Sequence, residues 1–521
     1  MADPEKPSGT KPAAKRAPAK PRARMAEASA TAERYRVLQV ASECGAYART
    51  GGLGDVVAAL SKELARLGHE VRVVMPLYAS IDRARHAITF ERSSCVHMPN
   101  GEEAWVGVHR AELDERVTVW LVDYQRFFGR AGIYDEVGAE YGDNAFRFAL
   151  LSRAALQVAQ DGGFVPDVVH VHDWPSALAT LYPRVWGAEP SPFARTASVL
   201  TIHNVGYQGN FHASVRAYAG IGAAEWTPDR FEDHGRINLL KGGIAYADAI
   251  TTVSPTHARE LLTPDGGRGL APQLTARHGD LTGILNGIDE DEWDPARDRS
   301  IPAHFDADHL EGKAISKLML QRFFQLEQDA ALPVFGIVTR LAQQKGIDLM
   351  MQVLPVALDR MHMQVVALGS GDLAAEDFLR WLQRAYPGRA GTETRFLNEL
   401  SHLIEAGSDF FLMPSIYEPC GLSQMYSMRY GTLPVVRATG GLDDTVENYD
   451  PATGHGTGFK FWDATPQAFF DTIGWAVATW FDRREHIAQL RRQAMAKRFS
   501  WRDSAEQYEK VYARALAKRR G

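Results

Sequence analysis

Residues 410–424, FFLMPSIYEPCGLSQ, join a short apolar run to a turn with two prolines and then to a helix. The run 410–413 predicts a buried strand that stops at Pro414, and the following turn carries the Glu418 carboxylate and the Cys420 thiol. Open α/β sheets bind their ligands in the crevice beyond the carboxyl ends of their strands. We therefore expect Glu418 and Cys420 to face such a crevice.

A second stretch, 433–446, reads LPVVRATGGLDDTV and complements the first. Its strand, 433–437, is followed by the glycine pair Gly440 and Gly441, which opens a helix. Free backbone amides at the start of a helix can face an anion or sugar hydroxyls. One carboxylate and one amide nest are therefore expected in the same crevice, although two ordinary strand-to-helix turns would give the same pattern.

Length and composition indicate a globular protein with two or three domains. The chain has 521 residues, of which 45% are hydrophobic and 23% charged, so it can bury a large core. The net charge of −6 is small for this size and argues against a partner such as nucleic acid or an anionic membrane. No apolar run reaches the roughly 18 residues that a membrane span needs.

The cysteines indicate the redox compartment. Cys44, Cys95 and Cys420 lie too far apart for CxxC metal pairs and are too few for a disulfide framework. A reducing cytoplasm is therefore the expected location.

The first residues, 1–33, differ in composition from the rest of the chain. Their lysines and arginines are spaced by alanine and proline, and they lack the apolar segment of a secretory signal. This composition predicts a disordered basic tail, for which a solvated extension without function is the simplest interpretation.

The ordered chain is expected to begin with a βαβ unit. A strand over 35–41 leads through the glycine loop 49–55, RTGGLGD, into a helix with one apolar face and then into a strand over 71–75. Gly51 and Gly52 let the backbone approach a ligand closely. The loop lacks the dinucleotide pattern GxGxxG, so a tight strand-to-helix turn is an open alternative.

Three further apolar runs end in polar residues, namely 168–174, 198–204 and 249–254. His170 and His172 point to the same face of the first of these strands and could bind a metal. No third ligand follows at a suitable spacing, so we expect no metal and assign His172 a hydrogen-bonding role.

A second α/β unit begins with a strand over 334–339, and a strand over 364–368 follows it. Arg340 and Lys345 stand on the loop after the first of these strands. Two cations beside a crevice suit a pyrophosphate, through bidentate contact from Arg340 and a point charge from Lys345. Unpaired surface charges are the alternative. Two such units predict two facing nucleotide-binding-like domains with a cleft between them.

Together these residues make the chain resemble the bacterial glycogen synthases, the ADP-glucose-dependent retaining glucosyltransferases of family 5, which include plant starch synthases. The likeness runs from Tyr35 to the C-terminus. Its motifs are TGGLGD at 50–55, HDW at 172–174, TIHN at 201–204, VSP at 253–255, NGID at 286–289, Arg340, Lys345, EPCGL at 418–422 and TGGL at 439–442.

The resemblance implies an α/β fold of the GT-B type, with two facing Rossmann-like domains and an interdomain cleft. An acceptor domain over 34–282 would precede a nucleotide-sugar domain over 283–498, and a final helix over 499–521 would return to the first domain. The implied reaction moves glucose from ADP-glucose to the nonreducing end of an α-1,4-glucan in glycogen biosynthesis, without cofactor or metal.

The resemblance also implies the roles of individual residues. Arg340 and Lys345 would hold the diphosphate and His172 would lie at the reacting sugar. Glu418 and the amides of Cys420, Gly440 and Gly441 would orient the donor. The other substrate-binding positions implied by the resemblance are Arg49, Gly51, Gly52, Asp55, Asp143, Asn286, Gly421 and, by spacing alone, Phe396 near adenine.

Arg49 is the clear departure, because the family has lysine before the glycine pair. An inactive glucan-binding paralogue is therefore one alternative. A related GT-B enzyme, such as a sucrose- or trehalose-forming transferase, is another, although the contiguous EPCGL and TGGLGD motifs disfavour it.

Overall fold

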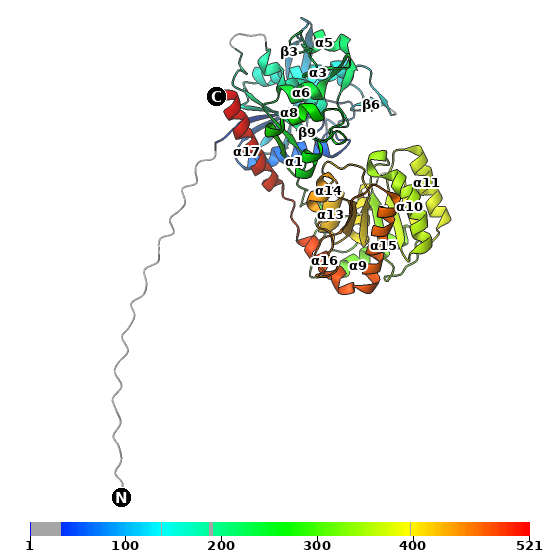
Figure 1. The fold of residues 1–521 in the computed structure, drawn as a ribbon. Coiled ribbons are helices and arrows are strands. Elements are labelled where there is room, and N and C mark those ends of the chain that lie inside the picture. The colour runs from blue at the N-terminus through cyan, green and yellow to red at the C-terminus, as the bar shows by residue number, and fades with distance from the viewer. Residues whose placement is uncertain (2–32, 137, 187–190, 396) are drawn as a thin grey trace. The chain divides into compact units, whose positions relative to one another are not determined.

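The computed structural model describes residues 1, 33–136, 138–186, 191–395 and 397–521, and residues Tyr35–Gly521 form one compact unit. The disordered tail predicted for 1–33 lies almost entirely outside the described residues. Two large β-sheets with their covering helices form most of the compact unit, and two small sheets, β10-β12-β11 and β6-β7, accompany them (Figure 1). This arrangement confirms the predicted α/β class with two Rossmann-like sheets.

The first sheet has nine strands in the order β14-β13-β9-β8-β1-β2-β5-β4-β3. All strands from β14 to β5 in this order run parallel, whereas β4 and β3 are antiparallel to their neighbours. The strands are β1 (Arg36–Val40), β2 (Glu70–Pro76), β3 (Thr89–His97), β4 (Glu103–Asp114), β5 (Val117–Asp123), β8 (Val168–His172), β9 (Ala197–Ile202), β13 (Ala249–Thr252) and β14 (Leu281–Gly283).

The second sheet has six parallel strands in the order β17-β16-β15-β18-β19-β20. Numbered along the chain, this is the 3-2-1-4-5-6 order of a doubly wound dinucleotide-binding sheet, with its switch point between β15 and β18. The strands are β15 (Val334–Val338), β16 (Gln364–Leu368), β17 (Ala390–Glu393), β18 (Phe410–Met413), β19 (Leu433–Arg437) and β20 (Phe459–Phe461).

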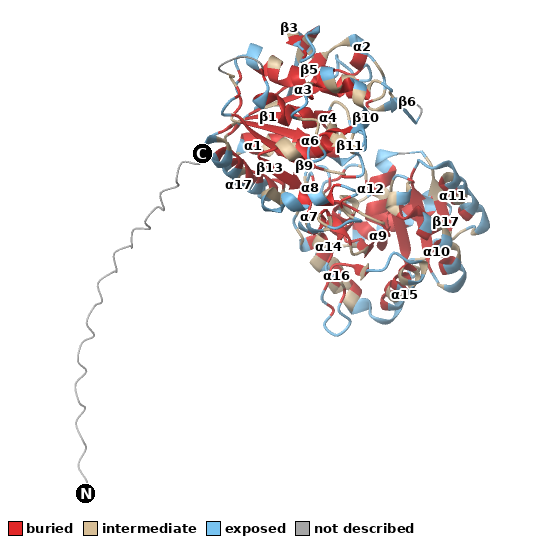
Figure 2. Cartoon of the chain, turned by 45° about the horizontal axis from the view of Figure 1, so that its top comes forward, coloured by how far each residue is buried: buried red, intermediate tan, exposed pale blue. Residues whose placement is uncertain are grey.

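Helices cover both sheets, so the central strands are buried on both faces and consist of almost continuous apolar runs (Figure 2). The longer helices are α1 (Gly52–Arg66), α3 (Asn144–Asp161), α6 (Leu239–Tyr246), α9 (Glu311–Phe323), α10 (Ile347–Arg360), α11 (Leu373–Ala385), α12 (Asn398–Gly407), α15 (Pro466–Asp482), α16 (Arg484–Ala496) and α17 (Trp501–Arg520). The short elements are α2 (Gln125–Phe128), α4 (Asp173–Ser176), α5 (Arg216–Ala219), α7 (Pro255–Glu260), α8 (Ala271–Ala276), α13 (Ser423–Arg429), α14 (Gly440–Thr445), β6 (Asp135–Glu136), β7 (Ala139–Glu140), β10 (Asn210–His212), β11 (Glu232–Asp233) and β12 (Arg236–Asn238). None of the described helices has a segment long and apolar enough to span a membrane.

The last helix, α17, packs against the first sheet although it follows the second sheet in sequence (Figure 1). Its buried side chains belong to the same apolar core as β1, β8 and β9. Its polar contacts include two to histidines: the Tyr512 hydroxyl lies 2.8 Å from Nδ1 of His170, and Glu509 lies 2.8 Å from Nε2 of His69. The chain therefore passes from the second sheet back to the first before it ends.

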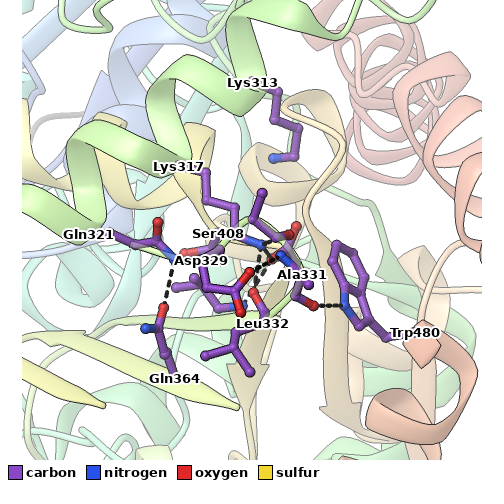
Figure 3. A network of polar contacts seen from close by, with 12 residues as sticks. Lys313, Lys317, Gln321, Asp329, Ala331, Leu332, Gln364, Ser408 and Trp480 are labelled. Carbon is purple, nitrogen blue, oxygen red and sulfur yellow. Dashed lines mark hydrogen bonds and ion pairs between the residues drawn. The ribbon is translucent and has the colours of Figure 1, made fainter. Parts of the chain in front are cut away.

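A buried charge cluster lies at the amino-terminal ends of β15 and β18 (Figure 3). The Asp409 carboxylate accepts from Nζ of Lys317 at 2.7 Å, from the Arg491 guanidinium at 2.6 Å and from the amide of Val334 at 2.9 Å. Nearby, the Trp480 indole donates to the carbonyl of Ala331 at 2.6 Å. The cluster ties α9, α15 and α16 to the second sheet, at the end opposite the carboxyl ends of its strands.

Candidate active site

A cavity of about 470 Å³ lies at the carboxyl ends of strands from both sheets. In the first sheet these strands are β1 and β8, which flank its switch point, together with β9; in the second they are β15 and β18. Both halves of the cavity therefore lie where open α/β sheets bind ligands. Its lining includes Glu43, Thr50, Gly51, Gly52, Asp173, His203, Asn204, Asn286, Arg340, Lys345, Glu418, Cys420, Gly421 and Ser423.

Glu418 and Lys345 form an ion pair in this cavity. Nζ of Lys345 lies 2.6 Å from Oε2 of Glu418, and the hydroxyl of Ser415 donates to the same oxygen at 3.0 Å. Glu418 is only 5% exposed, so an unpaired carboxylate here would be costly. The structure thus brings together the two residues that the sequence placed on separate loops and pairs them directly.

The backbone of this turn is held by Arg437 and Ser254. Nε of Arg437 donates to the carbonyl of Ser415 at 2.9 Å, and the same guanidinium donates to the carbonyl of Ile416. The Ser254 hydroxyl, from the loop after β13, donates to the carbonyl of Pro419 at 2.6 Å. These contacts fix the direction of the Glu418 side chain.

Arg340 also lines the cavity, and its side chain is exposed. Its guanidinium makes no hydrogen bond or ion pair with any of the residues that the structure describes. It therefore presents an uncompensated positive charge beside the Lys345–Glu418 pair, as a site for an anionic group requires.

The glycine pair is explained by close packing. Gly440 has φ +45°, and a side chain on Gly440 or Gly441 would overlap the backbone of the turn at Glu418 and Cys420. The amide of Gly440 donates to Oε1 of Glu260 at 3.0 Å, and that of Gly441 donates to the carbonyl of Glu418 at 3.1 Å. Neither glycine lines the cavity, so the donor contact expected of their amides stays a prediction.

Cys420 and Asn286 lie together on the cavity wall. Burial raises the pKa of the Cys420 thiol to about 12, so it is neutral at physiological pH and unsuited to nucleophilic attack. The side-chain oxygen of Asn286 is buried and has no hydrogen-bond partner among the described residues. An unsatisfied acceptor in a cavity wall suits a ligand that brings a donor, such as a sugar hydroxyl.

A chain of neutral histidines leads to the cavity. The Gln39 side-chain oxygen lies 2.8 Å from Nε2 of His172, which assigns the His172 proton to Nε2, and Nδ1 of His172 then accepts from Nε2 of His203 at 2.9 Å. Burial lowers the pKa of His203 to about 3 and that of His172 well below its usual value. His203 lines the cavity, whereas His172 lies fully buried behind it.

His170 has both ring nitrogens in hydrogen bonds, to Tyr512 at 2.8 Å and to Thr201 at 2.6 Å. The two nitrogens of His172 are also used. The histidine pair of β8 is therefore part of the hydrogen-bonded core.

Two further carboxylates lie in the cavity wall: Glu43, which was not predicted, and Asp173, which was quoted only as part of the HDW motif. Glu43 accepts from the amide of Thr50 at 2.7 Å and from the Tyr134 hydroxyl at 2.6 Å, and so holds the glycine loop. Asp173 has φ +55° and accepts from the amide of His203 at 2.7 Å. Burial raises the pKa of Asp173 to about 8. Their positions in the sequence could have indicated that Glu43 and Asp173 line a ligand site, because Glu43 follows strand β1 and Asp173 follows strand β8.

Besides the glycine pair, three predicted substrate-binding residues, Arg49, Asp55 and Asp143, do not line the cavity. Arg49 binds Asp55 at 2.9 Å, and both side chains are at least one-third exposed. Asp143 accepts a bidentate contact from Arg130, with both distances 2.6 Å. Phe396 lies outside the described residues. The substrate contacts expected of these four residues stay predictions.

Two Rossmann-like sheets that share one cavity at their strand ends have the architecture of a GT-B glycosyltransferase, and the sequence comparisons agree. Residues 36–276 match the family described as starch synthase catalytic domain, and residues 321–494 match glycosyl transferases group 1. The GT-B class predicted from the motifs is thereby confirmed.

Individual relatives define the family. The chain is 46% identical to glycogen synthase 1 of Geobacter sulfurreducens, over 94% of this chain and 98% of that one. It is 44% identical to glycogen synthase of Treponema denticola, over 93% and 99%. The catalytic domain of starch synthase IV from Arabidopsis thaliana, solved with ADP and acarbose, superposes with a TM-score of 0.85 at 33% identity, over 93% of this chain and all of that one. The chain belongs to the family of glycogen and starch synthases and is a glucosyltransferase of glycogen biosynthesis.

Proposed function

We propose that the chain transfers glucose from ADP-glucose to the nonreducing end of an α-1,4-glucan, with retention of configuration, in the cytoplasm. The observation that carries this proposal is the cavity in which the free cation Arg340 lies beside the Lys345–Glu418 pair. The starch synthase neighbour, which holds ADP and acarbose, supports a donor with an ADP group and a glucan acceptor.

Arg340 and Lys345 hold the diphosphate in this proposal. Negative charge grows on the diphosphate as its bond to the sugar breaks, and cations placed where that charge develops stabilise it. Lys345 is already fixed by Glu418, so little reorganisation is needed when the donor binds. Arg340 adds the planar fork that suits two phosphate oxygens.

Glu418 orients the donor sugar and does not attack it. Oε2 of Glu418 is shared by Lys345 and Ser415, which lowers its nucleophilicity, and Oε1 can accept from sugar hydroxyls. In the proposed step the bond from C1 to the diphosphate breaks, and the acceptor hydroxyl bonds to C1 on the same face. Its proton passes to the departing diphosphate, so no protein nucleophile or external base is required.

Incubation of the purified chain with ADP-glucose and glycogen is expected to release ADP and to lengthen the glucan. UDP-glucose as donor and fructose 6-phosphate as acceptor are the matched comparisons. Glucan elongation only with ADP-glucose supports the proposal. Glycogen binding without turnover would indicate an inactive paralogue, and transfer to fructose 6-phosphate would indicate a sucrose-forming enzyme.

Arg49 is expected to contribute to donor binding through its charge. Its guanidinium is half-exposed and is held by Asp55 at the start of the glycine loop. We expect Arg49→Ala to lower kcat/KM for ADP-glucose roughly tenfold, the equivalent of about 1.4 kcal/mol. Arg49→Lys should retain most activity but change the ratio of ADP-glucose to UDP-glucose use, because lysine cannot bind two oxygens in one plane. If Arg49→Ala has the same kcat/KM as the wild type for both ADP-glucose and UDP-glucose, Arg49 takes no part in donor binding.

A further inference from the structure

We propose that Cys95, His97 and Glu103 form a binding site for one divalent transition-metal ion of the zinc type. The three residues lie on β3 and β4, which form an antiparallel pair at the edge of the first sheet. One ligand atom from each residue lies within 4.8 Å of the other two. None of the three lines the catalytic cavity, so the site is separate from glucosyl transfer.

Strand register creates this cluster. His97 lies directly opposite Glu103, so their side chains share one face of the sheet, and Cys95 shares that face because it is two residues away along β3. Nδ1 of His97 lies 3.6 Å from Oε1 of Glu103, and the Cys95 sulfur has a ligand atom of each of these two residues within 4.8 Å. Spacing along the sequence could not indicate Glu103 as the third ligand, because only the pairing of β4 with β3 brings it next to His97.

The ligand set and its geometry suit zinc. Thiolate, imidazole and carboxylate bind zinc at roughly 2.0–2.3 Å, and ligand atoms at these distances around a tetrahedral ion lie about 3.5 Å apart. The His97 to Glu103 separation already has this value, and small rotations of the exposed side chains bring the thiol into range. A hard cation such as Mg²⁺ would not favour the sulfur ligand.

The backbone beneath the cluster is fixed. The amide of Met98 donates to the carbonyl of Glu102 at 2.8 Å, which closes the turn between the strands. Nε of Arg153, from α3, donates to the carbonyl of His97 at 3.0 Å. Ordering of the ligands therefore requires side-chain rotation only, which keeps the entropic cost of binding low.

Binding exchanges the thiol proton for the metal ion. The Cys95 S–H bond breaks, the proton passes to solvent, and a bond from sulfur to the metal forms without a change in oxidation state. Water completes the fourth position, because three ligands come from the protein. The bound ion links the edge strand β3 to β4 and protects the most accessible of the three cysteines.

Titration of the full, tag-free chain with Co²⁺ tests the site. We expect one equivalent to produce the near-ultraviolet charge-transfer absorption of a cobalt thiolate, and Zn²⁺ to displace the cobalt. Cys95→Ser should abolish this absorption, and His97→Ala and Glu103→Gln should each weaken binding at least tenfold. His109→Gln, on the same face of β4, is the matched control and should bind as wild type does.

Thiol reactivity gives a second measurement on the same protein. Zn²⁺ should slow the reaction of one cysteine with a disulfide reagent in the wild type but not in Cys95→Ser. Thermal unfolding without metal checks that each variant is folded. A thiolate band that persists in Cys95→Ser, or Zn²⁺ affinities equal in that variant and the wild type, would overturn the proposal, as would the absence of a cobalt thiolate band in the wild type.

Discussion

Lys345→Ala is expected to lower kcat/KM for ADP-glucose roughly a hundredfold. The substitution removes a charge-assisted contact to the diphosphate, and such contacts contribute about 1.5–3 kcal/mol. It also leaves the Glu418 carboxylate, which is 5% exposed, without its cation at 2.6 Å. Both effects raise the barrier to glucosyl transfer. Since about 1.4 kcal/mol corresponds to a factor of ten in rate, a combined loss of about 2.8 kcal/mol gives the expected hundredfold decrease.

Initial rates of ADP release over a range of donor concentrations measure this loss. Lys345→Arg keeps the charge and is the matched control, so it should retain more activity than alanine although the shape of the cation changes. The double variant Lys345→Ala, Glu418→Gln separates the two effects. If part of the loss comes from an unpaired Glu418, the losses will be less than additive. Kinetics close to wild type in Lys345→Ala would refute the assignment.

The positions of Glu418, Lys345 and Arg340 follow from rules that act locally along the chain. Each residue comes after an apolar run that ends at a turn, and parallel strands bring their carboxyl ends to one edge of a sheet. The sequence therefore predicted that these residues meet in one crevice, and all three line one cavity. The ion pair itself was not predicted, because it depends on side-chain geometry.

The glycine pair and the histidines show where such rules fail. A strand-to-helix turn with free amides looks the same in sequence whether a ligand or a protein carboxylate accepts from them. Here Glu260, which is 180 residues away in sequence from Gly440, supplies the carboxylate. Similarly, alternation along β8 shows that His170 and His172 share a face. It cannot show that His203, which follows the neighbouring strand β9, lies between His172 and the cavity.

The Asp409 ion cluster could not be predicted from the sequence either, because its members are also far apart in the chain. Its partners Lys317 and Arg491 lie 92 and 82 residues away in sequence, on helices whose polar residues resemble an ordinary solvated face. Only the packing of α9 and α16 against the second sheet shows that these side chains are buried. Their function is structural, since Asp409 precedes β18 at the end opposite Glu418.

Asp409→Ala is expected to lower the free energy of unfolding by about 3–5 kcal/mol, the usual effect of removing one partner from a buried ion pair. The side chains of Lys317 and Arg491 are only 8% and 15% exposed, so both cations would lose their counter-charge in a poorly hydrated site. The amide of Val334 would also lose its acceptor. Urea unfolding monitored by circular dichroism measures the loss, with Lys317→Met as the matched variant. That variant should lose less, because Arg491 still pairs with Asp409.

The pH dependence gives an independent check of the same ion cluster. Burial alone would raise the pKa of Asp409, but Lys317 and Arg491 outweigh it and hold the pKa below its usual value. A depressed pKa in the folded state means that the stabilisation is fully present above the unfolded value of about 3.9 and is lost as the pH falls through the folded value. The difference in stability between wild type and Asp409→Asn should therefore be constant near neutral pH and shrink only in strong acid. A difference that vanishes between pH 7 and 5, or an alanine variant as stable as wild type, would show that the cluster does not stabilise the second sheet.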